Sequence, residues 1–119
     1  MRLKKRRDFL RAARGIRRVT SGLTLELCAA PVGDAGATRV GFTASRKIGN
    51  AVLRNRARRR LKAAAHALLP LYGLPGNDYV LVARRETLTR SFADLLCDLK
   101  SALFAAHARL GQSGTGDLR

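Results

Sequence analysis

Apolar residues recur at helical spacing among lysines and arginines at the start of the chain. They are Leu3, Phe9, Leu10 and Ala13. Residues three or four positions apart share one face of a helix, so the spacing predicts a short basic helix over residues 3–14. Gly15 follows, and glycine is the residue type at which helices commonly end.

Four later segments carry the pattern of extended strands. Leucines alternate with polar residues or cysteine over residues 23–29, and this period of two predicts a strand with one buried face. A weaker extended stretch, residues 16–20, precedes it. The next strand is predicted over residues 38–45, after a turn at 31–36, and the apolar run 79–83 is typical of an interior strand.

Two further helices are predicted from their caps and apolar stripes. Asn50 can cap a helix over residues 51–69, and the proline and glycine residues from Pro70 onward predict the end of this helix. One narrow face of this helix carries Leu53, Ala57, Leu61, Ala64 and Leu68. Ser91 and Asp94 have a spacing like that of a capping box, which predicts the start of a last, leucine-rich helix.

The predicted elements follow the order helix, strands, helix, strand and helix. This order indicates an α+β fold, in which helices pack mainly on one face of a small sheet. The sequence has no repeats and no internal boundary, so it predicts one domain over residues 1–110. Residues 111–119 are rich in glycine and polar residues, and they are expected to form a flexible tail.

The charge balance narrows the class of partner. The chain has 119 residues, with 24 Lys plus Arg against 8 Asp plus Glu, and a formal net charge of +16. Self-repulsion of this size is relieved when a polyanion binds. The hydrophobic content of 46% is too high for a disordered basic tail, so the composition predicts a folded nucleic-acid binder.

The cations concentrate where carboxylates are missing, since no Asp or Glu lies between Asp34 and Asp78. The basic residues of this stretch are Arg39, Arg46, Lys47, Arg54, Arg56, Arg58, Arg59, Arg60 and Lys62. A solvated charged face is the alternative interpretation, but such faces usually mix signs, and this pattern therefore favours phosphate binding. The segment before the basic helix is predicted to be a strand, which favours structured RNA over a helix-turn-helix contact with DNA.

The sequence offers no strong catalytic or metal-binding candidate. His66 and His107 occupy positions typical of surface or boundary histidines. Asp94 and Asp98 share a helix face, but basic neighbours make local ion pairing the preferred interpretation over a cation site. We therefore predict no catalytic residue and no metal ligand in the protein.

The two cysteines and the termini bear on the compartment. Cys28 and Cys97 sit among apolar residues, and we interpret them as small buried thiols in a reducing compartment rather than as a disulfide. The basic start of the chain lacks the features of a signal peptide, and no apolar run could span a bilayer. A cytoplasmic protein without a membrane partner is expected.

Three stretches of the chain resemble one known family. The signature region of the bacterial ribonuclease P protein subunit is similar to VGFTASRKIGNAVLRNRARRRLKAA, residues 40–64. The family's N-terminal helix resembles RLKKRRDFLRAARG, residues 2–15, and its last strand resembles DYVLVARR, residues 78–85. The resemblance runs in the family's order from Arg2 to Leu110.

The resemblance implies an αβββαβα fold with a left-handed βαβ crossover. It also implies a function, because the family binds a large catalytic RNA and with it removes the 5′ leader of precursor tRNA. This endonucleolytic hydrolysis depends on Mg²⁺ that the RNA holds, so the protein alone is not expected to be catalytic. The implied partners are the catalytic RNA and precursor tRNA, with no obligate protein partner.

The resemblance also implies roles for individual residues. Contacts with the catalytic RNA are implied for Arg46, Lys47, Asn50, Arg54, Asn55, Arg56, Arg58, Arg59 and Lys62. Contacts with the single-stranded leader are implied for Phe9, Arg11 and Arg14. Two alternatives stay open, since Asn55 could form a hydrogen bond within its own helix and Phe9 could belong to the core.

The chain departs from the family where aromatic side chains are expected. Members often have a second aromatic residue later in the first helix, where this chain has Ala12 and Ala13. Several also place one in the strand that corresponds to residues 23–29, which has none here. Arg11 and Arg14 are therefore candidates to hold the leader by charge instead of stacking.

Two other functions are compatible with parts of the pattern. A non-catalytic assembly protein, such as a ribosomal-protein-like RNA binder, would share the fold class and the charge. An autonomous nuclease would need clustered carboxylates or histidines, and the basic stretch offers only His66.

Overall fold

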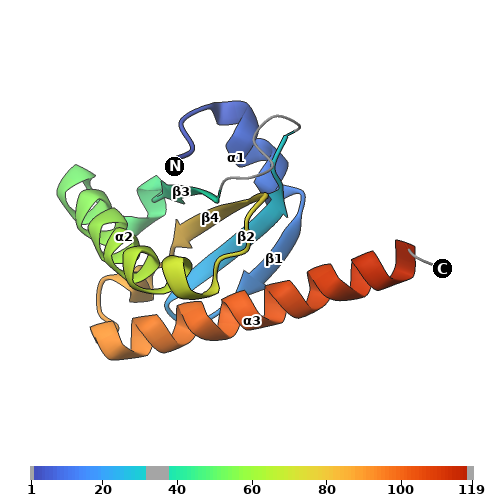
Figure 1. Cartoon of the computed structure of the whole chain (residues 1–119). Helices are drawn as coiled ribbons and strands as arrows, with labels where there is room; N and C mark the ends of the chain where they lie inside the picture. Colours follow the sequence, from blue (N-terminus) through green and yellow to red (C-terminus); the bar gives the residue numbers. More distant parts are fainter. Residues whose placement is uncertain (1, 32–37, 118–119) are drawn as a thin grey trace.

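One mixed sheet separates a short helix from two longer ones (Figure 1). The computed structural model describes residues 2–31 and 38–117, and of residues 111–117 only the backbone. The turn predicted at 31–36 lies almost entirely outside this range. The described elements are α1 (Arg6–Ala13), β1 (Ile16–Val19), β2 (Leu23–Ala29), β3 (Arg39–Thr43), the 3₁₀ turn η1 (Arg46–Ile48), α2 (Ala51–Tyr72), β4 (Asn77–Ala83), the 3₁₀ turn η2 (Arg85–Thr87) and α3 (Phe92–Asp117).

The sheet confirms the predicted α+β class and the αβββαβα order. Its strands lie in the order β1-β2-β4-β3, with β1–β2 and β2–β4 antiparallel and β3–β4 parallel. The connection between the parallel strands contains α2, so β3, α2 and β4 form the βαβ unit. The left-handedness of this crossover stays a prediction.

Helices cover both faces of the sheet, whereas the sequence predicts them mainly on one. Alternate residues of β2 and β4, including Leu25 and Leu81, point into the main core with α2 and α3. Val80 faces the other way, into a smaller cluster with Ala12 of α1. The cover on this second face is why Glu26 is also buried, although a single buried face is predicted for its strand.

α2 shows the predicted cap and apolar stripe. The Oδ1 of Asn50 accepts a hydrogen bond from the backbone N–H of Leu53 at 3.0 Å, and Leu61 lies fully buried at the centre of the stripe. The predicted end is wrong, because Pro70 lies inside the last turn and the helix continues to Tyr72. A proline removes only one hydrogen bond of the helix, and the N–H of Gly73 still closes the turn on the carbonyl of Leu69 at 2.7 Å.

The other helices differ from prediction at their ends. α1 starts at Arg6 because Leu3 pairs with the sheet edge, where its N–H donates to the carbonyl of Val40 at 2.8 Å. Helical backbone continues in α3 through residues 111–117, and the flexibility expected of residues 111–119 stays a prediction. A hydrogen-bonded helix can propagate through residues of low helix propensity such as glycine.

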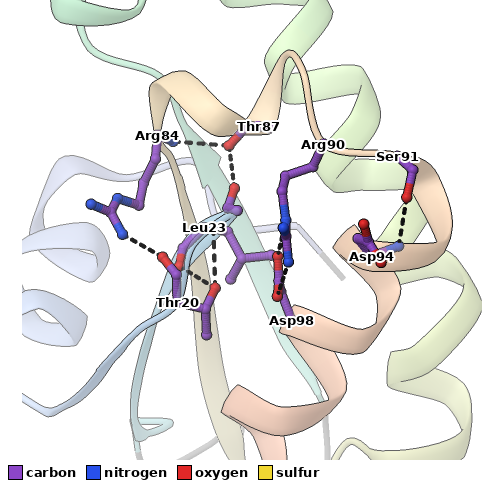
Figure 2. Close-up of polar contacts among 9 residues, drawn as sticks. Thr20, Leu23, Arg84, Thr87, Arg90, Ser91, Asp94 and Asp98 are labelled. Carbon is purple, nitrogen blue, oxygen red and sulfur yellow. Dashed lines mark hydrogen bonds and ion pairs between the residues drawn. The ribbon is translucent and has the colours of Figure 1, made fainter.

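The buried hydroxyl of Thr87 joins the β1–β2 turn to the segment after β4 (Figure 2). Its oxygen accepts from the N–H of Arg84 at 2.9 Å, and the hydroxyl donates to the carbonyl of Gly22. The guanidinium of Arg84 also donates to the carbonyl of Thr20. One small polar residue thus ties two segments that lie 65 positions apart in the chain.

The start of α3 lies beside the same turn (Figure 2). The N–H of Asp94 donates to the Ser91 hydroxyl at 3.1 Å, and Arg90 forms an ion pair with Asp98 at 2.9 Å, which confirms both sequence interpretations. Gly22 is needed for this close approach, because a Cβ there would lie 2.5 Å from a carboxylate oxygen of Asp98.

Replacing Thr87 by Val should lower the free energy of unfolding by about 1–3 kcal/mol. The valine keeps the shape of threonine but leaves the N–H of Arg84 and the carbonyl of Gly22 without this partner. Urea denaturation measures the change. The matched control is Thr89→Val at an exposed position, which should change stability by less than about 0.5 kcal/mol. Equal stability of the two variants would contradict the role given to the hydroxyl.

Candidate nucleic-acid interface

The arginines of α2 divide into two groups by their position around the helix. Arg54 and Arg60 flank the buried stripe and are half-buried. The Nε of Arg54 donates to the carbonyl of Ala44 at 2.9 Å, and the guanidinium of Arg60 donates to the carbonyl of Arg90. Arg54 therefore helps to hold α2 against the end of β3, a structural role that the sequence did not reveal.

The second group faces away from the core. Asn55, Arg56 and Arg59 are exposed, while Arg58 and Lys62 are half-buried. We call these five residues the α2 basic face. Apart from Arg56, they line a shallow depression of about 370 Å³ together with the exposed Val52.

Within the α2 basic face, Arg58 donates a hydrogen bond to the side-chain oxygen of Asn55. This contact is the local role left open for Asn55, and it orients the Arg58 guanidinium along the helix surface. No carboxylate occurs in α2, so none of its cations is neutralised by a neighbour in the same helix. The result is a concentrated positive surface with several guanidinium groups, which suit phosphate oxygens.

The residues before α2 extend this surface at its N-terminal end. Arg46 and Lys47 are both exposed on η1, as a basic pair beside the helix. Gly49 follows with φ at 143°, a backbone conformation that favours glycine, and this turn places Asn50 at the cap. The side-chain oxygen of Asn50 is engaged by that cap, which leaves its amide N–H groups for an RNA contact.

The three residues implied to contact the leader lie on or next to α1, across the sheet from α2. The Phe9 ring is half-buried on the cluster of Leu3, Ala12 and Val80. It also lies over β3, where a Cβ on Gly41 would be 2.6 Å from two ring atoms. Phe9 thus contributes to the second core and keeps part of its surface exposed.

The two arginines that accompany Phe9 differ sharply from each other. Arg14 is exposed just after α1. Arg11 is half-buried, and its guanidinium forms ion pairs with Asp8, at 3.0 Å, and with Asp78. Arg11 therefore serves the fold, whereas Arg14 is exposed to solvent.

Arg11 belongs to a buried charge cluster with Arg39, Asp8 and Asp78, which joins α1, β3 and β4. Asp78 is fully buried, and its carboxylate lies 3.0 Å from the Nε of Arg39. A terminal nitrogen of the same Arg39 guanidinium lies 3.0 Å from the carboxylate of Asp8. Burial alone would raise the pKa of Asp8, but the hydrogen bond from Arg11 and the charge of Arg39 outweigh it and hold that pKa below its ordinary value. The only local signal for this cluster in the sequence is the spacing of Asp8 and Arg11.

The candidate catalytic groups lie apart from one another. His66 is exposed, and His107 lies at the boundary of the core with its Nε2 2.8 Å from the Tyr79 hydroxyl. Burial lowers the pKa of His107. Among the residues that the structure describes, no group of three or more His, Cys, Asp or Glu could hold a metal ion.

Both cysteines are free thiols, as predicted. Cys28 is half-buried, and burial raises the pKa of its thiol, so it is a poor nucleophile at neutral pH. The prediction that Cys97 is buried is wrong, because it lies on the exposed side of α3. In the described part of the chain, no helix is long and apolar enough to cross a membrane.

Comparison with known proteins gives a consistent set of relatives. The family model described as Ribonuclease P matches residues 1–107. The Ribonuclease P protein component of Ruegeria pomeroyi is 50% identical over 107 residues, covering 89% of this chain and 86% of that protein. The protein of the same name from Caulobacter vibrioides is 47% identical over 114 residues, covering 96% and 76%.

Solved structures share the fold at lower identity. The RNase P protein of Staphylococcus aureus superposes with a TM-score of 0.72 at 24% identity, covering 88% of this chain and 94% of that chain. The RNase P protein from Thermotoga maritima has a TM-score of 0.71 at 22% identity, covering 87% and 94%.

Replacing Asp8 by Asn should lower the free energy of unfolding at neutral pH by about 3 kcal/mol, because it leaves the buried arginines with one carboxylate fewer. The folded-state pKa of Asp8 is depressed, so its contribution to stability is complete above the ordinary pKa of aspartate. That contribution disappears as the pH falls through the depressed pKa. The difference between wild type and Asp8→Asn should therefore shrink below about pH 4.

Urea denaturation of both proteins between pH 3 and pH 7, in roughly one-unit steps, tests this dependence. Glu86→Gln is the control, because it removes an exposed carboxylate outside the cluster. A difference between wild type and Asp8→Asn that stays constant over the whole pH range would contradict the assigned ion pairs.

Proposed function

Because the chain belongs to the ribonuclease P protein family, we propose that it binds the RNA of ribonuclease P through the α2 basic face and the Arg46–Lys47 pair. Membership makes the chain a subunit of this tRNA-processing endoribonuclease and associates it with that RNA. The observation that supports the assigned surface is the run of outward cations on α2 without a carboxylate in the helix.

The contribution of this surface to affinity is electrostatic. Each cation that contacts a phosphate releases condensed counterions, so binding weakens as salt rises. Arginines add paired hydrogen bonds to phosphate oxygens, and they can stack on unpaired bases. Arg56 and Arg59 are the strongest candidates, because both are exposed and neither has a hydrogen bond to another described residue that would hold it to the fold.

The catalytic centre is proposed to lie in the RNA. RNA phosphates and the scissile phosphodiester supply oxygen ligands, which Mg²⁺ prefers. The protein would support this chemistry by lowering the repulsion between the catalytic RNA, the substrate and their shared charges. In this scheme Mg²⁺ serves the RNA, and no protein residue is assigned as its ligand.

Precursor tRNA is the proposed substrate, with its 5′ leader lying along α1. The exposed part of the Phe9 ring offers a stacking surface, and Arg14 offers an exposed charge. Both contacts tolerate variation in leader sequence, because every base has an aromatic face and every nucleotide a phosphate. No obligate protein partner is proposed, and a cytoplasmic location follows from a role in bacterial tRNA maturation.

Replacing Arg56 and Arg59 together by Ala should weaken binding to ribonuclease P RNA. The salt slope, which is the steepness with which the logarithm of the binding constant falls with the logarithm of the salt concentration, should decrease by about 2, one unit for each lost phosphate contact. The measurement is affinity by filter binding across a salt series. Arg85→Ala with Arg109→Ala removes the same charge from exposed positions outside α2 and serves as the control. If both double variants lose the same affinity and slope, binding depends on net charge and not on the α2 basic face.

Cleavage of a precursor tRNA at low Mg²⁺ tests the function itself, with bacterial ribonuclease P RNA alone, protein alone, and both together. The expected result is cleavage that requires the RNA and that the protein strongly enhances. Cleavage by the protein alone would support an autonomous nuclease. Binding to the RNA without any enhancement would support an assembly protein.

A further inference from the structure

A larger cavity, of about 620 Å³, opens between α2, the β3 edge and the turn after α2. Its size is within the roughly 300–1,000 Å³ of small-ligand sites. Its lining includes Arg2, Val40, Phe42, Lys62, His66 and Leu69. It lies on the opposite side of the sheet from Phe9, so it is separate from the surface proposed for the leader.

The lining combines apolar walls with cationic and aromatic groups. Val40 and Phe42 of β3 and Leu69 of α2 supply the walls, and both β3 residues pack against the main core. The guanidinium of Arg2 lies 5.5 Å from the centre of the Phe42 ring, in a cation–π contact. No carboxylate is among the described residues that line the cavity.

Lys62 connects this cavity to the α2 basic face, because it lines both. Asn55, Arg59, Lys62 and His66 recur at helical spacing along one side of α2, so a strand of RNA that follows this side reaches the cavity. His66 is exposed at that point. The cavity is thus continuous with the surface that attracts phosphates.

We propose that this cavity receives one unpaired base of the bound RNA, with the phosphate of that nucleotide on Lys62. The proposal rests on the proposed function of the α2 basic face. A base presents a flat aromatic face, which can stack where the Arg2 guanidinium lies over the Phe42 ring, and its phosphate requires a nearby cation. A duplex cannot enter in this way, because its bases are stacked and paired.

The test uses a short single-stranded uridine oligomer that carries one 2-aminopurine, whose fluorescence falls when the base stacks. Wild type should quench the probe on binding, and an otherwise identical duplex should show much less quenching. Phe42→Leu should weaken binding of the single strand by roughly fivefold or more, without changing the salt slope, because stacking is lost but no phosphate contact is. Lys62→Gln should instead reduce the slope by about 1.

Phe104→Leu is the matched control, since Phe104 is 51% exposed on α3 and does not line the cavity. It should leave both quenching and affinity unchanged. A single strand with 4-thiouridine gives a second readout on the unaltered protein, because irradiation should attach it to the segments that contain Phe42 or His66. This readout keeps the test informative if Phe42→Leu folds poorly.

Several outcomes would overturn the proposal. Equal affinity and quenching for Phe42→Leu and Phe104→Leu would do so, as would crosslinks confined to α1. Wild type that binds ribonuclease P RNA with the expected salt dependence but does not quench the probe would refute the base site and leave the proposed function intact. Wild type that fails to bind ribonuclease P RNA would instead refute the proposed function.

Discussion

The ion pairs of the buried Asp78 carboxylate are the interaction on which the packing of helices on the sheet depends. Asp78 lies at the start of the central strand β4, and it contacts Arg11 of α1 and Arg39 of β3. A buried charge is costly unless it is paired, and here the two arginines are balanced by Asp78 together with Asp8. This neutral cluster fixes α1 on one face of the sheet and leaves the other face to α2 and α3.

The same cluster helps to explain why a chain of net charge +16 can expose an unopposed basic helix. Carboxylates are scarce, and those with ion pairs in the described structure stand at Asp8, Asp78 and Asp98, outside α2. The cations of the α2 basic face are left to interact with solvent or with a polyanion. These cations repel one another in the free protein. Binding RNA removes this repulsion, so its removal contributes to the free energy of binding.

Local signals predicted much of the fold, because they act over a few residues. The Asn50 cap, the stripe around Leu61 and the alternation over residues 23–29 each specify an element within one or two turns of chain. The position of α1 could not be predicted in this way, since its decisive contact joins residues 67 positions apart. The cavity beside α2 could not be predicted for the same reason, because its walls come from segments far apart in the sequence: the N-terminus, β3 and the end of α2.

The basic run of α2 shows how helix phase separates roles that composition cannot. Arg54, Arg56, Arg59 and Arg60 are chemically identical and nearly adjacent. The first and last donate to backbone carbonyls outside α2, while the middle two face solvent. The contacts implied by the family resemblance place Arg54, Arg56 and Arg59 on one surface. Their positions relative to the buried stripe divide them into residues that position the helix and residues that are free to meet RNA. Arg54 lies next to the stripe and is half-buried with its Nε bonded to the fold, so its contact with the sheet and the RNA contact implied for it fall on the same side chain.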